Sequence, residues 1–265
     1  MSENKNMTQR NPTAAMVAIG DEILSGRTRD ANMHYLANWL TARGVNLIEV
    51  RVVPDVEDVI VAAVNDVRAT ADYVFTSGGI GPTHDDITAL AIGKAFEAHT
   101  DVRYDALAIL KEWYDARGEE ITPARRRMAR VPEGASLIAN AVSGAPGFRI
   151  GNVFVMAGVP KIFQAMLEAV DDQIERGPSR ISFTVRGNAR ESEIAEALAA
   201  LQASHPDISI GSYPGKTGQG RNVAIVLRGY VREDVHAVAL KVHEIMQQKE
   251  MRPELIEGMP VTDED

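Results

Sequence analysis

Two adjacent aspartates follow a glycine-rich segment in the stretch Ser77-Gly78-Gly79-Ile80-Gly81-Pro82-Thr83-His84-Asp85-Asp86. Glycines permit positive φ and let a ligand approach the backbone closely. A helix that starts after such a loop offers unpaired N–H groups and a partial positive charge. The stretch therefore indicates a phosphate site, with ligand contacts expected from Ser77, Gly78, Gly79, Gly81, Pro82 and Thr83.

The carboxylates of Asp85 and Asp86 would by themselves repel a phosphate. A divalent cation between carboxylate and phosphate removes that repulsion, since Mg²⁺ and similar ions prefer hard oxygen ligands. We therefore expect Asp86 and Asp85 to be catalytic and metal-binding. We also expect one of the two to cap the following helix while the other faces the ligand.

The glycine segment does not fit two better-known phosphate motifs. A Walker loop requires Lys and Ser or Thr after its last glycine, whereas Gly81 is followed by Pro82 and Thr83. The dinucleotide fingerprint follows the first strand of its domain, whereas this segment follows the third predicted strand.

Three further glycine or proline turns adjoin predicted strands. Gly20-Asp21-Glu22 follows the first strand, and neighbouring parallel strands would let Glu22 act as a third metal ligand beside Asp85 and Asp86. The other two turns contain Asn140 with Ser143 to Phe148, and Ala157 to Pro160. Each is by itself more typical of a structural turn. As ligand-binding positions in the three turns we expect Gly20, Gly144, Pro146, Gly147 and Gly158.

Strands alternate with helices over the first two thirds of the chain. Apolar runs predict strands, and apolar stripes at helical spacing predict the helices between them. This order predicts a three-layer α/β/α domain with a mostly parallel sheet. The predicted strands are 14–19, 46–53, 72–76, 148–150 and 153–156, and the predicted helices are 30–43, 86–96, 104–117, 123–130 and 160–175, with one more opening at Pro54 and Asp55.

The order of elements changes at Gly177-Pro178. A β-α-β-β-α order beyond it predicts a small α+β two-layer domain, with a tip at Gly215 to Arg221. The domains are therefore expected at 14–177 and 178–252. Polar residues 1–13 and acidic residues 253–265 are expected to be disordered tails.

Composition excludes several classes of function. The formal net charge of −9 repels nucleic acid and anionic membranes, so neither is expected as a partner. The absence of cysteine excludes disulfides, thiolate metal sites and a cysteine nucleophile. No apolar run approaches the roughly 20 residues of a membrane span, and no secretory signal is evident, so a cytoplasmic location is expected.

The glycine-rich segment and the three further turns, in their order along the chain, resemble the molybdopterin-binding-like domain that opens members of the competence/damage-inducible protein A (CinA) family. The matching pieces are Gly-Asp-Glu-Ile-Leu at 20–24, Gly-Gly-Ile-Gly-Pro-Thr-His-Asp-Asp at 78–86 and Ala-Pro-Gly-Phe at 145–148. The resemblance runs from about residue 14 to residue 175. Residues 180–229 are similar to the small domain that follows in that family.

The resemblance implies the fold of the proteins that adenylylate molybdopterin. In those relatives the glycine loop holds a pterin or nucleotide phosphate, and the aspartate aligned with Asp86 takes part in catalysis with a divalent metal. In the CinA family the domain is associated with metal-dependent cleavage of ADP-ribose at its pyrophosphate. A similar domain accompanies eukaryotic FAD synthases, where it is linked to hydrolysis of the FAD pyrophosphate.

The sequence departs from the family at two places. Full-length members carry a C-terminal amidase domain, which a chain ending at Asp265 is not expected to contain. The family's Pro-Gly-Pro-Pro turn is here Ala157-Gly158-Val159-Pro160, followed by Lys161, which is placed to meet an anionic ligand or solvent.

Two classes of function remain open from the sequence. The first is a metal-dependent hydrolase of a nucleoside-diphosphate linkage, an ADP-ribose pyrophosphatase-like enzyme using Mg²⁺, Mn²⁺ or Co²⁺. The alternative is a non-catalytic module that binds molybdopterin or a nucleotide such as FAD, with a molybdopterin adenylyltransferase-like enzyme as a third reading. A homo-oligomer is expected in either case, and the small domain has no assigned role.

Overall fold

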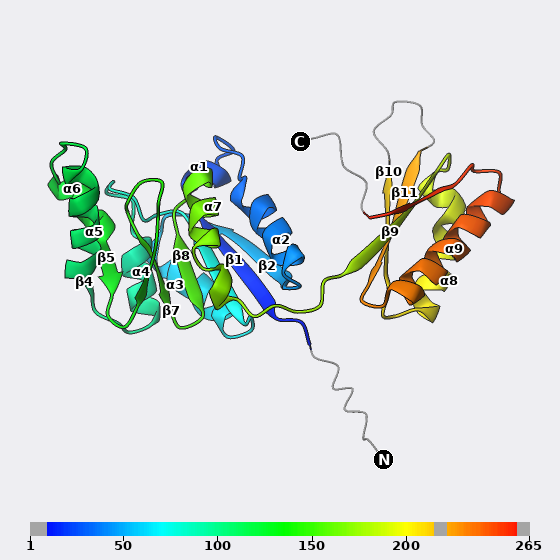
Figure 1. Ribbon diagram of the computed structural model, residues 1–265, viewed down its shortest axis with the longest axis horizontal. Coiled ribbons are helices and arrows are strands. Elements are labelled where there is room, and N and C mark those ends of the chain that lie inside the picture. The colour runs from blue at the N-terminus through cyan, green and yellow to red at the C-terminus, as the bar shows by residue number, and fades with distance from the viewer. Residues whose placement is uncertain (1–9, 215–221, 259–265) are drawn as a thin grey trace, which may run out of the picture. The chain divides into compact units, whose positions relative to one another are not determined.

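The computed structural model describes residues 10–214 and 222–258. The chain divides into two compact units after Gly177, each with its own main sheet (Figure 1). Residues 1–9, 215–221 and 259–265 lie outside the described residues, and with them the predicted tip at 215–221 and most of both predicted tails. Among the described residues, no helix has the length and apolar character needed to cross a membrane.

The first unit alternates strands and helices as the sequence predicts. Short 3₁₀ turns at Arg127–Ala129 and Asp171–Gln173 complete it. Its elements are β1 (Thr13–Ile19), α1 (Asp21–Leu24), α2 (Asn32–Ala42), β2 (Asn46–Val53), α3 (Glu57–Arg68), β3 (Tyr73–Ser77), α4 (Thr88–Ala95), β4 (Thr100–Val102), α5 (Tyr104–Asp115), α6 (Pro123–Arg126), β5 (Arg130–Pro132), β6 (Ser136–Ile138), β7 (Gly147–Ile150), β8 (Val153–Met156) and α7 (Pro160–Glu168).

The main sheet of the first unit is mixed and mostly parallel. Its strand order, over the described residues, is β2-β1-β3-β8-β7-β6. The pairs β1–β2, β1–β3 and β3–β8 are parallel, whereas β7 and β6 run antiparallel to their neighbours. The carboxyl ends of β2, β1, β3 and β8 therefore share one edge of the sheet, called the carboxyl edge below.

Alternating residues of β1 belong to two different hydrophobic cores. Ala15, Val17 and Ile19 pack with α3, α4 and α5, whereas Ala14, Met16 and Ala18 pack with α2 and α7. All seven residues of β1 are buried, as expected for a strand covered on both faces. The predicted three-layer α/β/α fold is therefore confirmed.

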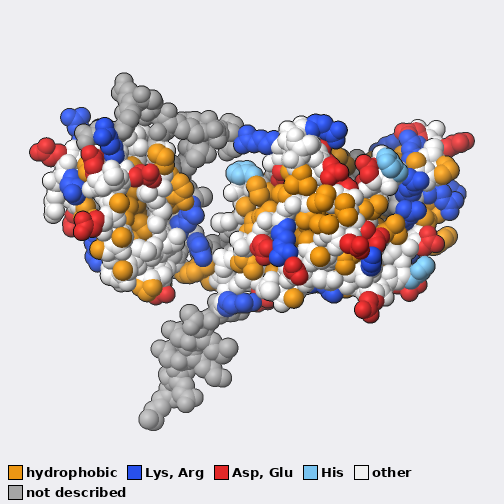
Figure 2. All heavy atoms as spheres, turned by 180° about the vertical axis from the view of Figure 1, so that it is seen from behind, with side chains coloured by type: hydrophobic (Ala, Val, Ile, Leu, Met, Phe, Trp, Pro, Cys, Tyr) orange, Lys and Arg blue, Asp and Glu red, His pale blue; other side chains and the backbone are white. Residues whose placement is uncertain are grey.

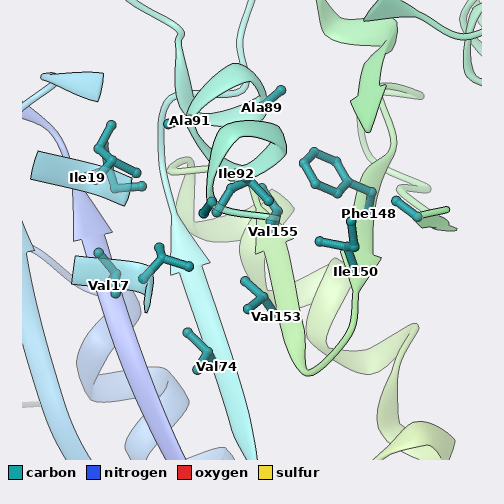
Figure 3. Packing of buried hydrophobic residues seen from close by; sticks show 14 of the residues in the cluster. Val17, Ile19, Val74, Ala89, Ala91, Ile92, Phe148, Ile150, Val153 and Val155 are labelled. Carbon is teal, nitrogen blue, oxygen red and sulfur yellow. The ribbon is translucent and has the colours of Figure 1, made fainter. Parts of the chain in front are cut away.

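Figure 3 shows how the core on the α3 and α4 side is filled. Branched side chains of neighbouring strands lie side by side beneath α4, and small residues on α4 let its backbone come close to the sheet. The labelled residues are Val17, Ile19, Val74, Val153, Val155, Phe148 and Ile150 from the sheet and Ala89, Ala91 and Ile92 from α4. This packing fixes the end of β3 and the start of α4.

The second unit is a two-layer sandwich. Its elements are β9 (Ile181–Gly187), α8 (Glu191–Ser204), β10 (Ser209–Pro214), β11 (Val223–Gly229), α9 (Arg232–Gln248) and β12 (Glu254–Glu257). The described strands form an antiparallel sheet in the order β10-β11-β9-β12. Both helices pack on one face around a separate hydrophobic core. The predicted small α+β domain is confirmed.

The structure corrects the predicted limits of both tails. Arg10 to Thr13 belong to the fold, since Asn11 donates to the carbonyl of Gly44 and β1 begins at Thr13. At the other end, β12 pairs with β9. The acidic composition around Glu254 obscured a short strand, because alternate residues of an edge strand remain solvated.

Exposed apolar side chains remain on the first unit. They include Ile48 and Val52 of the edge strand β2, together with Val56 and Val59 beside the start of α3. Figure 2 shows hydrophobic side chains gathered over the middle of the larger unit on the face that it presents. The expected homo-oligomer stays a prediction.

Candidate functional site

The carboxyl edge brings the predicted glycines together. Gly20 follows β1, Gly78 follows β3 and Gly158 comes shortly after β8. The N–H of Gly78 donates to the carbonyl of Met156 at 3.1 Å, and a Cβ added to Gly158 would lie 3.3 Å from Cα of Gly78. Three loops that are far apart in sequence therefore meet through their backbones.

Gly78 and Gly79 form the sharp exit from β3. Their φ angles are 109° and 68°, which L side chains rarely adopt. A Cβ on Gly78 would overlap the carbonyl oxygen of Ile19, and one on Gly79 would overlap the hydroxyl of Thr88. The N–H of Thr88 donates to the carbonyl of Gly79 at 2.9 Å. Both glycines are thus required by geometry, whatever the ligand.

Several backbone N–H groups of these loops are free to bind a ligand. Among the described residues, the N–H groups of Gly79, Ile80 and Gly81 have no protein acceptor, and neither do those of Gly158 and Val159. These residues are partly or fully exposed. Phosphate oxygens are natural acceptors for such groups at loop–helix junctions.

The N-termini of α4 and α7 also open at the carboxyl edge. Neither helix has a side-chain cap. The N–H of Thr88 is taken by the carbonyl of Gly79, and Pro160 at the start of α7 has no N–H. Among the described residues, the first-turn N–H groups of Ala89, Leu90 and Lys161 have no protein acceptor. Lys161 is exposed in the first turn of α7. The helix dipoles and this ammonium group all favour an anion at the edge.

Asp86 closes the glycine loop and does not cap α4. Its Oδ2 accepts hydrogen bonds from the N–H and the hydroxyl of Thr83, at 2.7 and 2.5 Å. The helix starts only at Thr88, after the uncapped Ile87. The predicted capping role is therefore wrong, and Thr83, expected to bind phosphate, has both of its donors engaged by Asp86.

Asp85 is the aspartate of the pair that faces solvent. Its side chain is 62% exposed, and its Oδ1 lies 3.8 Å from Nδ1 of the exposed His84. Pro82 is exposed beside it. Of the two aspartates, Asp85 is therefore the more exposed to a ligand, and the Thr83 hydroxyl beside it lowers the pKa of its carboxyl.

A third acidic element joins the carboxyl edge from β2. Asp55 follows the end of β2, and its Oδ2 accepts a hydrogen bond from the N–H of Asp21 at 3.0 Å. Burial raises the pKa of the Asp55 carboxyl, while the bond from Asp21 opposes the shift. The negative charges of Asp21, Glu22 and Asp85 raise this pKa further. The sequence does not single out Asp55, although its position after the neighbouring strand is the signal that would have found it.

The gathered carboxylates do not amount to a preformed metal centre. In the part of the chain that the structure describes, no three His, Cys, Asp or Glu side chains are placed to hold one ion. The carboxylate of Glu22 folds back over Gly20, since a Cβ added there would lie 2.5 Å from Oε2. The expected ligands Glu22, Asp85 and Asp86 therefore gather at one edge without forming a three-ligand cage.

Asn32 lies beneath the three loops, at the start of α2. It is 3% exposed, and its Nδ2 donates to Oγ of Ser77 and to the carbonyl of Gly158, both at 2.7 Å. Its Oδ1 has no partner among the described residues, and the same holds for the buried hydroxyl of Thr88. Ser77, expected to touch the ligand, is itself buried and instead anchors Asn32.

The turn after β6 reaches the same edge by a different route. Gly147 starts β7, which pairs antiparallel with β8, so it lies level with the end of β8. Asn140 shapes this turn: its Nδ2 donates to Oγ of Ser143 and the carbonyl of Ala145, at 2.6 and 2.8 Å. A Cβ on Gly144 would overlap the ring of Trp113. The geometry gives Gly144 a packing role, and Pro146 lies beside Gly147 at the edge.

Comparison with known protein families agrees with this division of the chain. The family described as "Probable molybdopterin binding domain" matches residues 15–176. The family described as "FAD synthase, middle domain" matches residues 180–254. The second unit is therefore similar to a part of FAD synthases, not to an amidase.

Individual relatives and a solved structure are also similar to this chain. A solved structure of the protein CinA, of unknown function, from Thermoplasma acidophilum is 34% identical with a TM-score of 0.57, and the match covers 62% of this chain and 98% of that one. A protein of Pyrobaculum calidifontis is 38% identical over 77% of this chain and 81% of its own length. A "Probable FAD synthase" of Caenorhabditis briggsae is 30% identical over 88% of this chain, which spans 49% of that relative. The chain therefore belongs to the molybdopterin-binding-domain family, with a CinA-like first unit.

Proposed function

We propose that the first unit binds a small molecule with a nucleoside-diphosphate linkage at the carboxyl edge and hydrolyses that linkage with a divalent cation. The observation that carries the proposal is one juxtaposition. Free N–H groups of Gly79 to Gly81 and of Gly158 and Val159 lie at the same sheet edge as the carboxylates of Asp85 and Asp55. ADP-ribose is the leading substrate and FAD is the second.

The two kinds of group have complementary tasks. The backbone N–H groups and the uncapped starts of α4 and α7 suit the phosphate oxygens. Mg²⁺ in proteins is commonly held by one or two carboxylates together with substrate phosphates, so a site without a three-ligand cage suits an ion that arrives with the ligand. Bound there, the cation would supply charge neutralisation and an acidified water.

Asp85 is the better candidate for contact with such a cation. Its carboxylate is open to solvent, while Asp86 is committed to Thr83. Asp86 then acts by fixing the loop that presents the N–H groups, or exchanges Thr83 for the cation when the ligand binds. The two roles of Asp86 are separable by substitution with Asn and with Ala.

The test is a hydrolysis assay with ADP-ribose and FAD, each with Mg²⁺, Mn²⁺ or Co²⁺ and with a chelator. The proposal predicts AMP as a product only when metal is present. It also predicts that Asp85→Ala loses nearly all turnover while its circular dichroism spectrum is unchanged. Metal-independent turnover, or full turnover in Asp85→Ala, would contradict it.

A non-catalytic binding module is the second candidate function. It is favoured by the N–H groups of Gly79 to Gly81 and of Gly158 and Val159, which have no acceptor among the described residues and suffice to bind a phosphate. Calorimetric titration with ADP-ribose, FAD and molybdopterin separates the two candidates. Saturable binding of one ligand, without product after long incubation with each metal, would establish the module and exclude the hydrolase.

A further inference from the structure

A pocket of about 300 Å³ opens in the second unit, and none of its lining residues belongs to the carboxyl edge. Its volume is at the lower end of the range for small-molecule sites. Polar residues dominate its lining, which includes Arg180, Gln202, Asp207, Ser209, Arg228 and Tyr230. Such a lining suits a small charged group better than an apolar ligand.

One wall of the pocket is held rigid by Gln202 of α8. Its Nε2 donates to the carbonyls of His205 and Ile208, at 3.3 and 2.8 Å, and its Oε1 accepts from the N–H of Ile210 at 2.9 Å. These hydrogen bonds join the amide to the backbone of the segment from His205 to Ile210, which connects α8 to the start of β10. This segment, which carries Asp207 and Ser209, is therefore fixed before any ligand arrives.

Arg180 provides an oriented positive charge. Its Nε donates to the hydroxyl of Tyr230 at 3.1 Å, and its guanidinium lies 5.5 Å from the centre of that ring. Within residues 10–214 and 222–258 it forms no ion pair with a carboxylate. Its two terminal nitrogens thus remain for an anion, in the paired geometry that a guanidinium offers to phosphate.

Arg228 places a second guanidinium at the same pocket. It lies near the end of β11, and the strand register sets it opposite Ser209 of β10. The lining therefore includes the side chains of two arginines and of Asp207.

From the fixed wall and the oriented guanidinium we propose that this pocket binds a phosphate group, either as the free ion or as the terminal phosphate of a nucleotide. The hydroxyl of Ser209 and the guanidinium of Arg180 act as its donors. This site is independent of the proposed function, because every residue that lines it belongs to the second unit.

The test uses the full chain labelled with ¹⁵N and followed by heteronuclear NMR. Inorganic phosphate and AMP are titrated in separate arms at low ionic strength, with chloride at matched ionic strength as the blank. Saturable shifts are expected at the Nε–H signal of Arg180 and at the amides of Ser209 and Tyr230. Tighter binding of AMP than of phosphate identifies a nucleotide as the occupant, and equal binding identifies the phosphate group alone.

Two substitutions make the test decisive. Arg180→Ala is expected to weaken binding by about tenfold or more, since a charge-assisted hydrogen bond is lost. Arg186→Ala is the matched control. Arg228 of β11 pairs with Ser182 near the start of β9, whereas Arg186 lies near the other end of that strand. Shifts that do not saturate, or equal affinity in Arg180→Ala and the control, overturn the proposal.

Discussion

Asp86 holds Thr83 by two hydrogen bonds, at 2.7 Å to its N–H and 2.5 Å to its hydroxyl. The aspartate thus shapes the loop from three residues downstream. Gly81 makes room for this arrangement, since a Cβ there would lie 2.7 Å from Oδ2 of Asp86. Because this carboxylate also holds the loop in shape, a loss of activity when it is removed would not by itself show that it takes part in the chemistry.

Asn and Ala at position 86 are therefore expected to differ. Asp86→Asn keeps a side-chain oxygen that can accept from Thr83, so the loop and ligand affinity should be retained while any contribution of the charge is lost. Asp86→Ala removes the acceptor and is expected to weaken ligand binding by about tenfold, from lost hydrogen bonds of roughly 1–3 kcal/mol. Calorimetric titration with ADP-ribose measures both.

The Thr83→Val variant is the control for position 86. It removes the hydroxyl donor but keeps the N–H, so its affinity should lie between those of the wild type and Asp86→Ala. Turnover lost in Asp86→Asn with affinity unchanged would assign a chemical role to the charge. Equal affinity in all three variants would show that the Thr83–Asp86 contact does not shape the ligand site.

Gly79 is expected to tolerate no side chain. Gly79→Ala places an L residue at φ 68°, which costs about 1–2 kcal/mol, and drives its Cβ into the hydroxyl of Thr88. A lowered urea midpoint and loss of ligand affinity are expected. In the double variant with Thr88→Ala the overlap is removed, so part of the stability should return while the backbone cost remains. No recovery in the double variant would contradict the packing explanation.

Asp55→Asn is expected to stabilise the first unit at neutral pH. Burial and nearby charges raise the pKa of Asp55 in the folded state above the unfolded value of about 3.9. Ionisation of Asp55 therefore lowers the free energy of unfolding as pH rises from that value through the raised pKa. The amide keeps an oxygen for the N–H of Asp21. Urea unfolding from pH 3 to 8 should give the variant a higher free energy of unfolding than the wild type at neutral pH, and the difference should disappear in acid.

Asp72→Asn provides a comparison of opposite sign. Hydrogen bonds from Thr13 lower the pKa of Asp72, with Arg10 adding a weaker attraction. Its stabilisation is therefore present at neutral pH and is lost as pH falls from the ordinary carboxyl range through the lowered value. The variant should be less stable than the wild type at pH 7, with a difference that shrinks in acid. Stability differences that change with pH in the same direction for Asp55→Asn and Asp72→Asn would refute at least one of the two assignments.

Asn32→Ala is expected to impair the site as well as the fold. The change leaves Oγ of Ser77 and the carbonyl of Gly158 without their buried donor, at a cost of roughly 1–3 kcal/mol. The loop after β8 should loosen, so hydrogen exchange should rise at Ile162, whose N–H donates to the carbonyl of Val159. Asn38→Ala, an exposed position on the same helix, is the control. Unchanged exchange at Ile162 in Asn32→Ala would show that Asn32 does not hold this loop.

The fold was predictable where elements are long and their pattern is strong. The apolar β1 and the β-branched β2 were predicted within a residue, because tertiary packing reinforces the local preference there. The three-residue strands β4, β5 and β6 were missed, since three residues show no periodicity. The four-residue α1 was read as loop for the same reason.

The location of the site was predictable from the sequence, whereas the arrangement of its side chains was not. Strand ends identified the loops at Gly20, Gly78 and Gly158, because parallel strands align their carboxyl ends. The orientation of Asp86 was not predictable, since it depends on a hydrogen bond to Thr83 within an irregular loop. Asp55 was missed because its role comes from the charges around it, which only the fold assembles.

The two hydrogen bonds of Asn32 have a consequence for how the protein is made. They join the first residue of α2 to the end of β3 and to a loop 126 residues further along the chain. Contacts of such sequence separation form late, after the loop-closure entropy has been overcome. During synthesis, the ligand site cannot be complete until the chain has emerged beyond Gly158. A nascent or truncated chain that ends before that residue would carry the glycine loop and its aspartates without the means to hold them in place.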